Sequence, residues 1–246
     1  YYAGTNNYYL NFKPKESVDA VLEDAAEMGL KVVRTWGNLD AGVKTDKVSD
    51  KGYTVFTDSV DGSGEKEGVY YQYFDADLGR PVVNEGEDGL QKLDYALYKA
   101  EQEGIKLLIT FTNNWEAFGG MGQYVQWAKL AGENVSGHDD FYTNETIKGW
   151  YKDYIKTLLN HENVYTGVKY KDDPTIFSWE LANEPRCESD AGCENNTVVK
   201  WATEMSAYVK SIDNNHMLAV GDEGFYNYGY NDFPEGDNKY VYHGSS

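Results

Sequence analysis

The sequence predicts an α/β fold: a (β/α)8 TIM barrel in a single domain over residues 1–246, holding about the first five strand–helix units. Short apolar runs alternate with amphipathic stretches, which indicates parallel strands joined by crossover helices. A doubly wound sheet would also fit this alternation. Two observations favour the barrel: no Gly-rich phosphate-binding turn follows the first strand, and the residues suited to chemistry fall at the ends of successive strands.

The elements follow from apolar periodicity along the chain. The expected strands cover residues 6–10, 31–36, 105–111, 175–181 and 217–220. The expected helices cover residues 17–29, 90–104, 143–158 and 197–212. Glycines close the first two helices at Gly29 and Gly104, and Thr143 is expected to cap the third. Because long loops use up much of the length, we expect the barrel domain to be incomplete at its C-terminal end.

Residues 37–89 are too long for a simple strand-to-helix connection. Two strand-like runs, at residues 53–56 and 69–74, predict a hairpin that decorates a βα loop. Three acidic residues between the runs could in principle hold calcium: Asp58, Asp61 and Glu65. Their spacing does not match a calcium loop, so we interpret them as a solvated acidic turn.

Composition excludes several classes of function. Forty-one acidic residues against 22 basic ones give a net charge of -19, so we expect no binding to nucleic acid or to an anionic membrane. The 22 tyrosines suit a surface that stacks on sugars, although they could equally fill a β-rich core. The sequence carries no zinc, nucleotide or serine-nucleophile signature, and we expect no metal and no cofactor.

The strongest local signal is the segment Trp-Glu-Leu-Ala-Asn-Glu-Pro-Arg at residues 179–186, which ends the fourth strand. Pro185 stops the strand and fixes the chain direction after it. Glu184 is thereby placed in a cleft, where a carboxylic acid can protonate a leaving oxygen, and Asn183 can hydrogen-bond a sugar hydroxyl. Taken alone, a glutamate beside a proline is weak evidence for catalysis.

Five motifs in order give the sequence a wider resemblance. They are Gly4-Thr5-Asn6, Arg34-Thr35-Trp36-Gly37, Asn113-Asn114-Trp115, the segment 179–186 and Glu223-Gly224-Phe225. By these motifs the chain resembles glycoside hydrolase family 5, specifically its endo-β-1,4-mannanase branch. The resemblance implies a (β/α)8 barrel that hydrolyses mannan or glucomannan by a retaining double displacement.

The resemblance also implies roles for individual residues. Glu184 matches the acid/base, and Asn183 matches the neighbour that binds the sugar 2-hydroxyl. The matches that bind substrate or support the catalytic carboxylates are Arg34, Trp36, Trp115, Arg186 and Glu223. The family's nucleophile follows a seventh strand, which places it beyond residue 246. Considered without the family, Glu223 is a rival nucleophile, because a retaining glycosidase carries two carboxyls about 5 Å apart.

Strand alternation gives other residues a structural interpretation. Glu180 shares its parity with Glu184, so we expect it to point into the barrel beside Arg34 as a structural ion pair. Trp179 has the opposite parity and is expected in the core. His216 is interpreted as a structural hydrogen-bonding residue and His243 as part of a loop.

Cys187 and Cys193 lie close enough along the chain for a loop disulfide, with two free thiols as the alternative. In an acidic, Tyr-rich glycosidase, one bridge indicates a secreted protein, and two cysteines are too few for a metal site. We expect a secreted monomer with mannan as its partner. Two other functions stay open: a cellulase of the same clan, or a non-catalytic carbohydrate-binding barrel remnant. Comparing hydrolysis rates on mannan and on cellulose would distinguish a mannanase from a cellulase. Binding to mannan without hydrolysis would indicate the carbohydrate-binding remnant.

Overall fold

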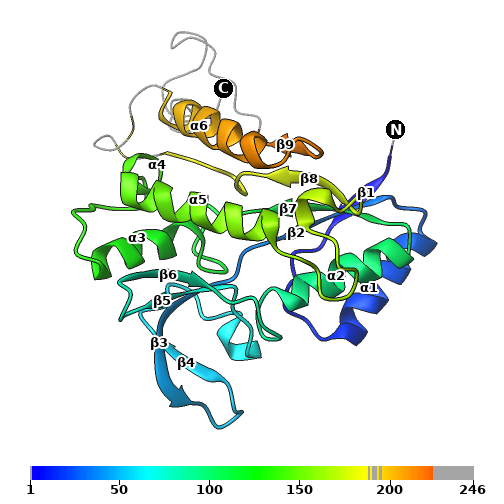
Figure 1. Cartoon of the computed structure of the whole chain (residues 1–246), viewed down its shortest axis with the longest axis horizontal. Helices are drawn as coiled ribbons and strands as arrows, with labels where there is room; N and C mark the ends of the chain where they lie inside the picture. The colour runs from blue at the N-terminus through cyan, green and yellow to red at the C-terminus, as the bar shows by residue number, and fades with distance from the viewer. Residues whose placement is uncertain (1, 188, 190–192, 194–195, 224–246) are drawn as a thin grey trace, which may run out of the picture.

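The computed structural model describes residues 2–187, 189, 193 and 196–223 and contains two sheets (Figure 1). The larger sheet has five strands in the order β1-β2-β7-β8-β9, and the smaller has four in the order β4-β3-β5-β6. The larger sheet consists of β1 (Gly4–Asn6), β2 (Val32–Trp36), β7 (Lys106–Thr110), β8 (Ile176–Glu180) and β9 (Met217–Ala219). No described helix is long and apolar enough to cross a membrane.

The order of the larger sheet confirms the predicted fold class. Each strand pairs in parallel with the next one in the sheet, and the order never reverses. A doubly wound sheet would reverse at a switch point, whereas sequential winding is the arrangement of a barrel. The described strands leave the sheet open between β1 and β9, so they form part of a barrel.

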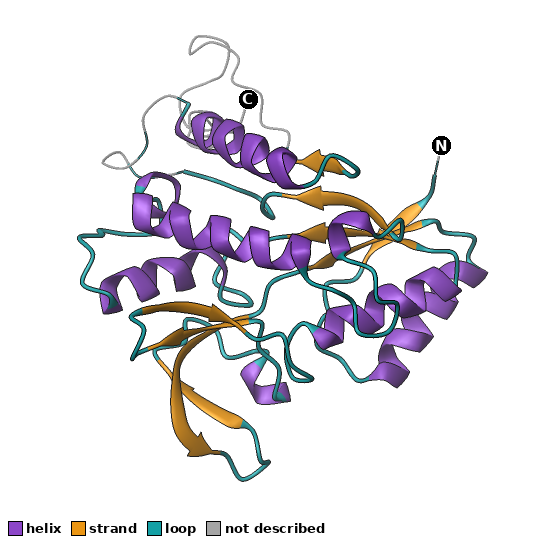
Figure 2. Cartoon of the chain, in the orientation of Figure 1, coloured by secondary structure: helices purple, strands orange, loops and turns teal. Residues whose placement is uncertain are grey.

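Four long helices follow one another along one side of the larger sheet (Figure 2). They are α1 (Lys15–Glu27), α2 (Gln91–Gln102), α5 (Glu145–Asn160) and α6 (Thr197–Ile212). The predicted closing glycines are confirmed, since Gly29 and Gly104 have φ of +75° and +66°. The predicted cap at Thr143 is wrong by one residue, because the Asn144 side chain accepts a hydrogen bond from the backbone of Ile147.

Short helices complete the connections. They are α3 (Gly120–Leu130), α4 (Asp140–Thr143) and the two 3-10 turns η1 (Glu65–Glu67) and η2 (Tyr170–Asp172). The predicted first strand, residues 6–10, is wrong. The observed β1 ends at Asn6, because the Asn7 side chain accepts a hydrogen bond from the backbone of Tyr9 and turns the chain.

The smaller sheet decorates the connection between β2 and α2 and differs from the predicted hairpin. It contains β3 (Asp40–Val48), β4 (Thr54–Thr57), β5 (Gln72–Asp75) and β6 (Arg80–Val83). The two predicted runs do not pair with each other: β4 pairs antiparallel with β3, and β5 pairs parallel with β3 and antiparallel with β6. The long, partly exposed β3 separates them, and its register shifts against both partners.

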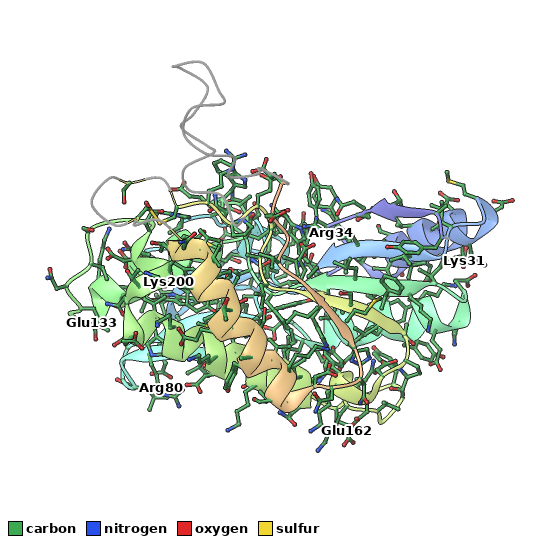
Figure 3. The ribbon with its side chains drawn as sticks, turned by 90° about the horizontal axis from the view of Figure 1, so that it is seen from above. Lys31, Arg34, Arg80, Glu133, Glu162 and Lys200 are labelled. Atoms are coloured by element: carbon green, nitrogen blue, oxygen red, sulfur yellow. A yellow bond between two sulfur atoms is a disulfide. The ribbon has the colours of Figure 1, made fainter. Side chains whose placement is uncertain are left out.

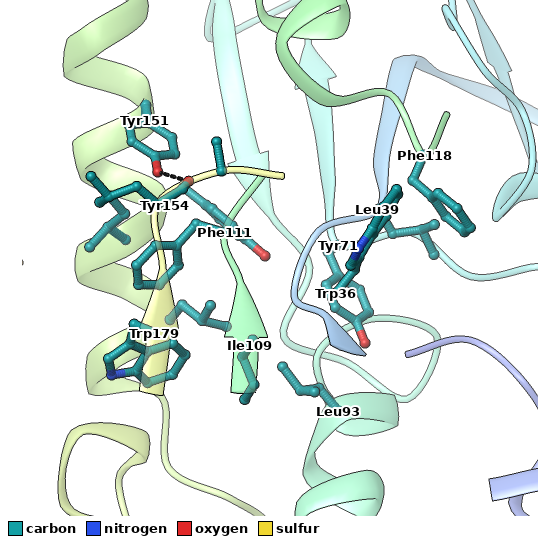
Figure 4. Close-up of a cluster of buried hydrophobic side chains, with 14 of the residues drawn as sticks. Trp36, Leu39, Tyr71, Leu93, Ile109, Phe111, Phe118, Tyr151, Tyr154 and Trp179 are labelled. Atoms are coloured by element: carbon teal, nitrogen blue, oxygen red, sulfur yellow. Dashed lines mark hydrogen bonds between the residues drawn. The ribbon is translucent and has the colours of Figure 1, made fainter. Parts of the chain in front are cut away.

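The core lies between the larger sheet and its helices and extends to Leu39, Tyr71 and Phe118 in the connections beside the smaller sheet (Figure 4). Phe111 and Trp179 stack with ring centroids 5.1 Å apart, and the Tyr151 hydroxyl donates to the carbonyl of Leu181 at 2.5 Å. Trp179 is fully buried, which confirms its predicted core position. Burying such a ring contributes about 2–3 kcal/mol to folding. This packing fixes the end of β8, where the segment 179–186 leaves the sheet.

Candidate active site

The predicted contact between Arg34 and Glu180 is confirmed and spans three strands. Arg34 on β2 donates to both carboxylate oxygens of Glu180 on β8, with Nε distances of 3.2 and 3.3 Å. Thr110 on β7, which lies between them, donates its hydroxyl to Glu180 Oε1 at 2.7 Å. Figure 3 shows Arg34 towards the middle of the molecule, whereas Lys31 lies at its edge. Glu180 is therefore held from two sides.

Arg34 also orients Asn183. Its Nη2 donates to Asn183 Oδ1 at 2.8 Å, and its Nη1 donates to Asn6 Oδ1 at 3.0 Å. The Asn183 amide nitrogen donates to Asn113 Oδ1 at 2.9 Å. An amide nitrogen carries two hydrogens, so one of them remains available for a ligand after this contact. Three of the five motifs named from the sequence thus meet at one amide.

The backbone that carries Glu184 is fixed by its neighbours on both sides. Asn114 N donates to Asn183 O at 3.0 Å, and Glu184 N donates to Gly221 O at 3.0 Å. Gly221 must be glycine, because a Cβ there would lie 1.8 Å from the carbonyl oxygen of Ala182. The strand pairing thus continues past the assigned end of β8 and holds residues 182–184 in place.

Glu184 adopts a backbone conformation that is uncommon for a residue with a side chain. Its φ is +52°, in the left-handed region, which costs about 1–3 kcal/mol and persists where surrounding contacts enforce it. Its half-buried carboxylate accepts a hydrogen bond from Trp115 Nε1 at 2.6 Å. The left-handed backbone and this bond together fix the direction of the Glu184 side chain.

Trp115, Arg186 and Glu223 continue from Glu184 as one chain of contacts. Trp115 is 44% exposed, and the guanidinium carbon of Arg186 lies 5.1 Å from its ring centroid. Arg186 in turn pairs with Glu223 through Nε and Nη2. The structure therefore brings four predicted site residues together around an exposed aromatic face, which suits stacking of a sugar ring.

Trp36 lies deeper than the other predicted site residues. It is 7% exposed and contacts Tyr8 and Phe118, with ring centroids 5.2 and 4.8 Å away. Its Nε1 has no hydrogen-bond partner among the described residues. Its assignment to substrate binding stays a prediction.

Asn114 joins the two loops that carry Trp115 and Arg186, a role that the sequence reasoning missed. Its Oδ1 accepts from Arg186 N at 3.0 Å, and its carbonyl lies 2.8 Å from His138 Nε2. The Tyr142 hydroxyl donates to the carbonyl of Arg186 at 3.0 Å. The sequence signal that could have indicated this role is the position of Asn114 within the strand-end motif Asn113-Asn114-Trp115.

Asp139 anchors the loop beyond Arg186. One carboxylate oxygen lies 3.0 Å from His138 Nδ1, and the other accepts from Ser189 N at 2.7 Å. Burial raises the pKa of Asp139, but the hydrogen bonds from His138 and Ser189 outweigh it and lower the pKa to about 2. The anchored loop contains the predicted disulfide, which is confirmed between Cys187 and Cys193.

Metal ligands do not gather at the site in the described part of the chain. The one grouping there is Asp139 with Cys187 and Cys193, whose sulfurs are bonded to each other and offer no thiolate. In the acidic turn, Asp61 accepts from Phe118 N and Glu65 accepts from the Ser59 hydroxyl. The first contact ties the turn to the loop that carries Trp115, and the second lies within the turn itself.

His216 has the structural contacts expected of it. Its Nδ1 lies 2.7 Å from Asp213 Oδ2, which also accepts from Trp179 Nε1 at 2.7 Å. Two other predictions fall outside the described residues: the Gly224-Phe225 part of the last motif, and His243.

Comparison with known proteins gives a consistent result. Residues 78–236 match the family described as GH family 5 beta-mannosidase-like. Mannan endo-1,4-beta-mannosidase 7 of Arabidopsis thaliana is 40% identical over 232 residues, which cover 92% of this chain and 46% of that protein. Mannan endo-1,4-beta-mannosidase F of Aspergillus clavatus is 40% identical over 225 residues, which cover 91% of this chain and 43% of that protein. The chain thus spans about half the length of the curated relatives it matches.

Solved structures agree with the sequence comparison. The endo-1,4-beta-mannanase of Rhizomucor miehei has a TM-score of 0.80 and 40% identity, covering 98% of this chain and 60% of that one. The hyperthermostable endo-1,4-beta-D-mannanase of Thermotoga petrophila has a TM-score of 0.72 and 41% identity, covering 98% of this chain and 61% of that one.

Proposed function

The chain belongs to glycoside hydrolase family 5, in its β-mannosidase-like group, and we propose that the protein hydrolyses internal β-1,4-mannosidic bonds of mannan or glucomannan. The names of its relatives support this substrate, since the two curated relatives above, which match over 92% and 91% of the chain, are mannan endo-1,4-beta-mannosidases. The observation that carries the proposal is the Glu184 carboxylate, fixed at a strand end beside the exposed ring of Trp115.

In the proposed mechanism Glu184 is the acid/base of a retaining double displacement. It protonates the leaving glycosidic oxygen and later removes a proton from the water that attacks the glycosyl-enzyme. The nucleophile is a glutamate after a seventh strand, beyond residue 246. The two glutamates near Glu184 have other partners, because Glu180 is bonded to Arg34 and Thr110 while Glu223 is paired with Arg186.

The remaining site residues bind and position the sugar. The second amide hydrogen of Asn183 is placed to reach a 2-hydroxyl, while Arg34 holds the amide oxygen and so fixes its direction. The exposed ring of Trp115 stacks on a sugar, and Arg186 and Glu223 bind hydroxyls beside it. We also propose that the protein is secreted, which the Cys187–Cys193 disulfide supports. The proposed double displacement uses two carboxyl groups and needs no cofactor.

The test is Glu184→Gln in the full-length protein, with Glu145→Gln on the exposed side of α5 as the matched control. Hydrolysis of mannohexaose should fall by about 10²–10⁴, because general acid catalysis typically contributes that much. The loss should be smaller on a mannobioside with a dinitrophenol leaving group, which needs no protonation. Near-normal turnover of mannohexaose would refute the assignment, and faster hydrolysis of cellulose than of mannan would refute the substrate.

A further inference from the structure

A groove with a volume of about 420 Å³ runs along β4 of the smaller sheet, outside the candidate active site. Its lining residues include the aromatic Tyr53 and Phe56 and the charged Asp50, Lys51, Glu65 and Lys66. Its volume falls in the range of about 300–1,000 Å³ that is usual for small-ligand sites, but the groove is open to solvent along its length and would hold a ligand on the surface without enclosing it. This groove, called the β4 groove below, therefore has the size for a short stretch of polysaccharide.

Both rings of the β4 groove are supported from behind. A Cβ at Gly68 would lie 2.5 Å from Tyr53 Cδ1, so the ring lies against backbone that only glycine leaves uncovered. Gly68 also has φ of +75°, which glycine adopts without strain. The ring of Phe56 meets the buried ring of Tyr70 at 4.7 Å between centroids. Rings already held in place lose little freedom when a ligand binds.

The charges of the β4 groove favour a neutral ligand with many hydroxyl groups. An anion would meet Asp50 and Glu65, and a cation would meet Lys51 and Lys66. A neutral pyranose accepts hydrogen bonds from ammonium groups and donates them to carboxylates. Its C–H face packs on an aromatic ring as other apolar surfaces do.

The same segment that lines the β4 groove also contacts the Trp115 loop. Glu65 and Lys66 line the groove, and a few residues earlier Asp61 accepts from Phe118 N at 2.7 Å. Val60 N donates to Gln123 Oε1 at 2.7 Å. The groove and the candidate active site are thus connected through one hydrogen-bonded loop.

We propose that the β4 groove is a second binding site for the neutral β-1,4-linked polysaccharide, separate from the site of cleavage. It holds a long chain on the enzyme while another part of that chain occupies the active site. The choice of mannan as the ligand rests on the proposed function. Short oligosaccharides that fill only the active site gain nothing from the groove.

The test uses Tyr53→Ala in the full-length protein, with Tyr165→Ala as the matched control. Tyr165 is a tyrosine that is 40% exposed, whereas Tyr53 is half-buried, and it lines a different pocket beside α1 and α2. Tyr53→Ala should weaken retention in galactomannan gels and raise the KM for polymeric mannan by about threefold to tenfold, the loss expected for one stacking ring. Its kcat/KM on mannohexaose should stay within about twofold of the parent, while Tyr165→Ala should match the parent in all three measurements.

Two further variants guard against a folding defect. Tyr53→Phe keeps the ring and should keep retention, and Lys66→Ala, at an exposed position, should weaken it without disturbing the core. Unchanged retention in both Tyr53→Ala and Lys66→Ala overturns the proposal, as does an equal loss in Tyr165→Ala. A full-length protein that cleaves no mannan but loses galactomannan retention on Tyr53→Ala overturns the proposed function and leaves the groove standing.

Discussion

The two sheets balance their buried carboxylates in opposite ways. On the larger sheet, Glu180 is paired with Arg34 and also accepts from Thr110. On the smaller sheet, Asp40 at the start of β3 is 3% exposed, and Gln72 donates to its Oδ1 while its Oδ2 has no described hydrogen-bond partner. Burial raises the pKa of Asp40 to about 7, although the hydrogen bond from Gln72 opposes this. The carboxylate of the larger sheet thus keeps its charge beside a cation, whereas Asp40 of the smaller sheet is partly protonated near pH 7.

Removing the cation should produce the largest effect. Arg34→Met leaves Glu180 buried without its partner, and breaking a buried pair in this way typically costs about 3–5 kcal/mol. The free energy of unfolding in urea measures the loss. The double variant Arg34→Met with Glu180→Gln should recover part of it, since no unpaired charge remains. About 1 kcal/mol is the usual effect of a single substitution. A loss no larger than this in Arg34→Met would contradict the contrast between the sheets.

Removing the carboxyl of Asp40 should change the stability of the protein by a smaller amount, and this change should depend on pH. Because the folded pKa of Asp40 is raised, its stabilising contribution is complete below about pH 4 and is lost as pH rises through about 7. The tyrosines that face it, Tyr124 and Tyr154, have pKa values raised well above their usual range by burial and stay neutral throughout. Asp40→Asn should therefore be more stable than the parent at pH 8 by about 2–4 kcal/mol, and similar to it at pH 4.

Thermal unfolding at pH 4, 6 and 8 measures this prediction for Asp40→Asn. Asp46→Asn is the matched control, since Asp46 is an exposed residue of the same strand and should show no pH-dependent gain. If the stability difference between parent and Asp40→Asn is the same at all three pH values, Asp40 does not hold a proton at neutral pH.

Asp139 adds a third case to the comparison of Glu180 and Asp40, because a histidine is one of its hydrogen-bond partners. Its folded pKa is lowered to about 2, so its contribution is present above about pH 4 and is lost as pH falls through about 2. Asp139→Asn should cost about 1–2 kcal/mol at pH 7 and loosen the loop that carries Arg186. KM for mannohexaose should rise about twofold to fivefold, with kcat nearly unchanged. Asp153→Asn, exposed on α5, is the control; a fall in kcat at constant KM would contradict a positioning role.

Most of the larger sheet, though not its first strand, could be predicted from the sequence because its elements have clear periodicity. The helix predicted at 197–212 is observed as α6 (Thr197–Ile212), and the strand predicted at 175–181 is observed as β8 (Ile176–Glu180). Strand parity also predicted that Glu180 meets Arg34 and that Trp179 is buried. These features depend on local pattern and on a buried sheet face, which the sequence records directly.

The smaller sheet could not be predicted in the same way. β3 (Asp40–Val48) is rich in polar residues, and its burial falls from the first residues to the exposed last ones, so its apolar pattern is weak. α3 (Gly120–Leu130) begins at two glycines, which hide a helical stripe formed by Met121, Tyr124, Val125 and Ala128. The links from Asn114 and Asp139 to the Arg186 loop join residues distant in sequence, and no local signal records such contacts.

The left-handed backbone at Glu184 lowers the local stability of the protein in order to hold a carboxyl group at this position. Glycine would adopt φ of +52° freely and relieve the strain, but it would remove the carboxyl to which we assign the proposed acid/base role. Selection for stability alone would favour glycine or asparagine at this position, so a glutamate with this backbone is expected where its carboxyl serves a function. Under the proposed mechanism, a relative with glycine at the position equivalent to Glu184 would keep the fold without cleaving its polysaccharide.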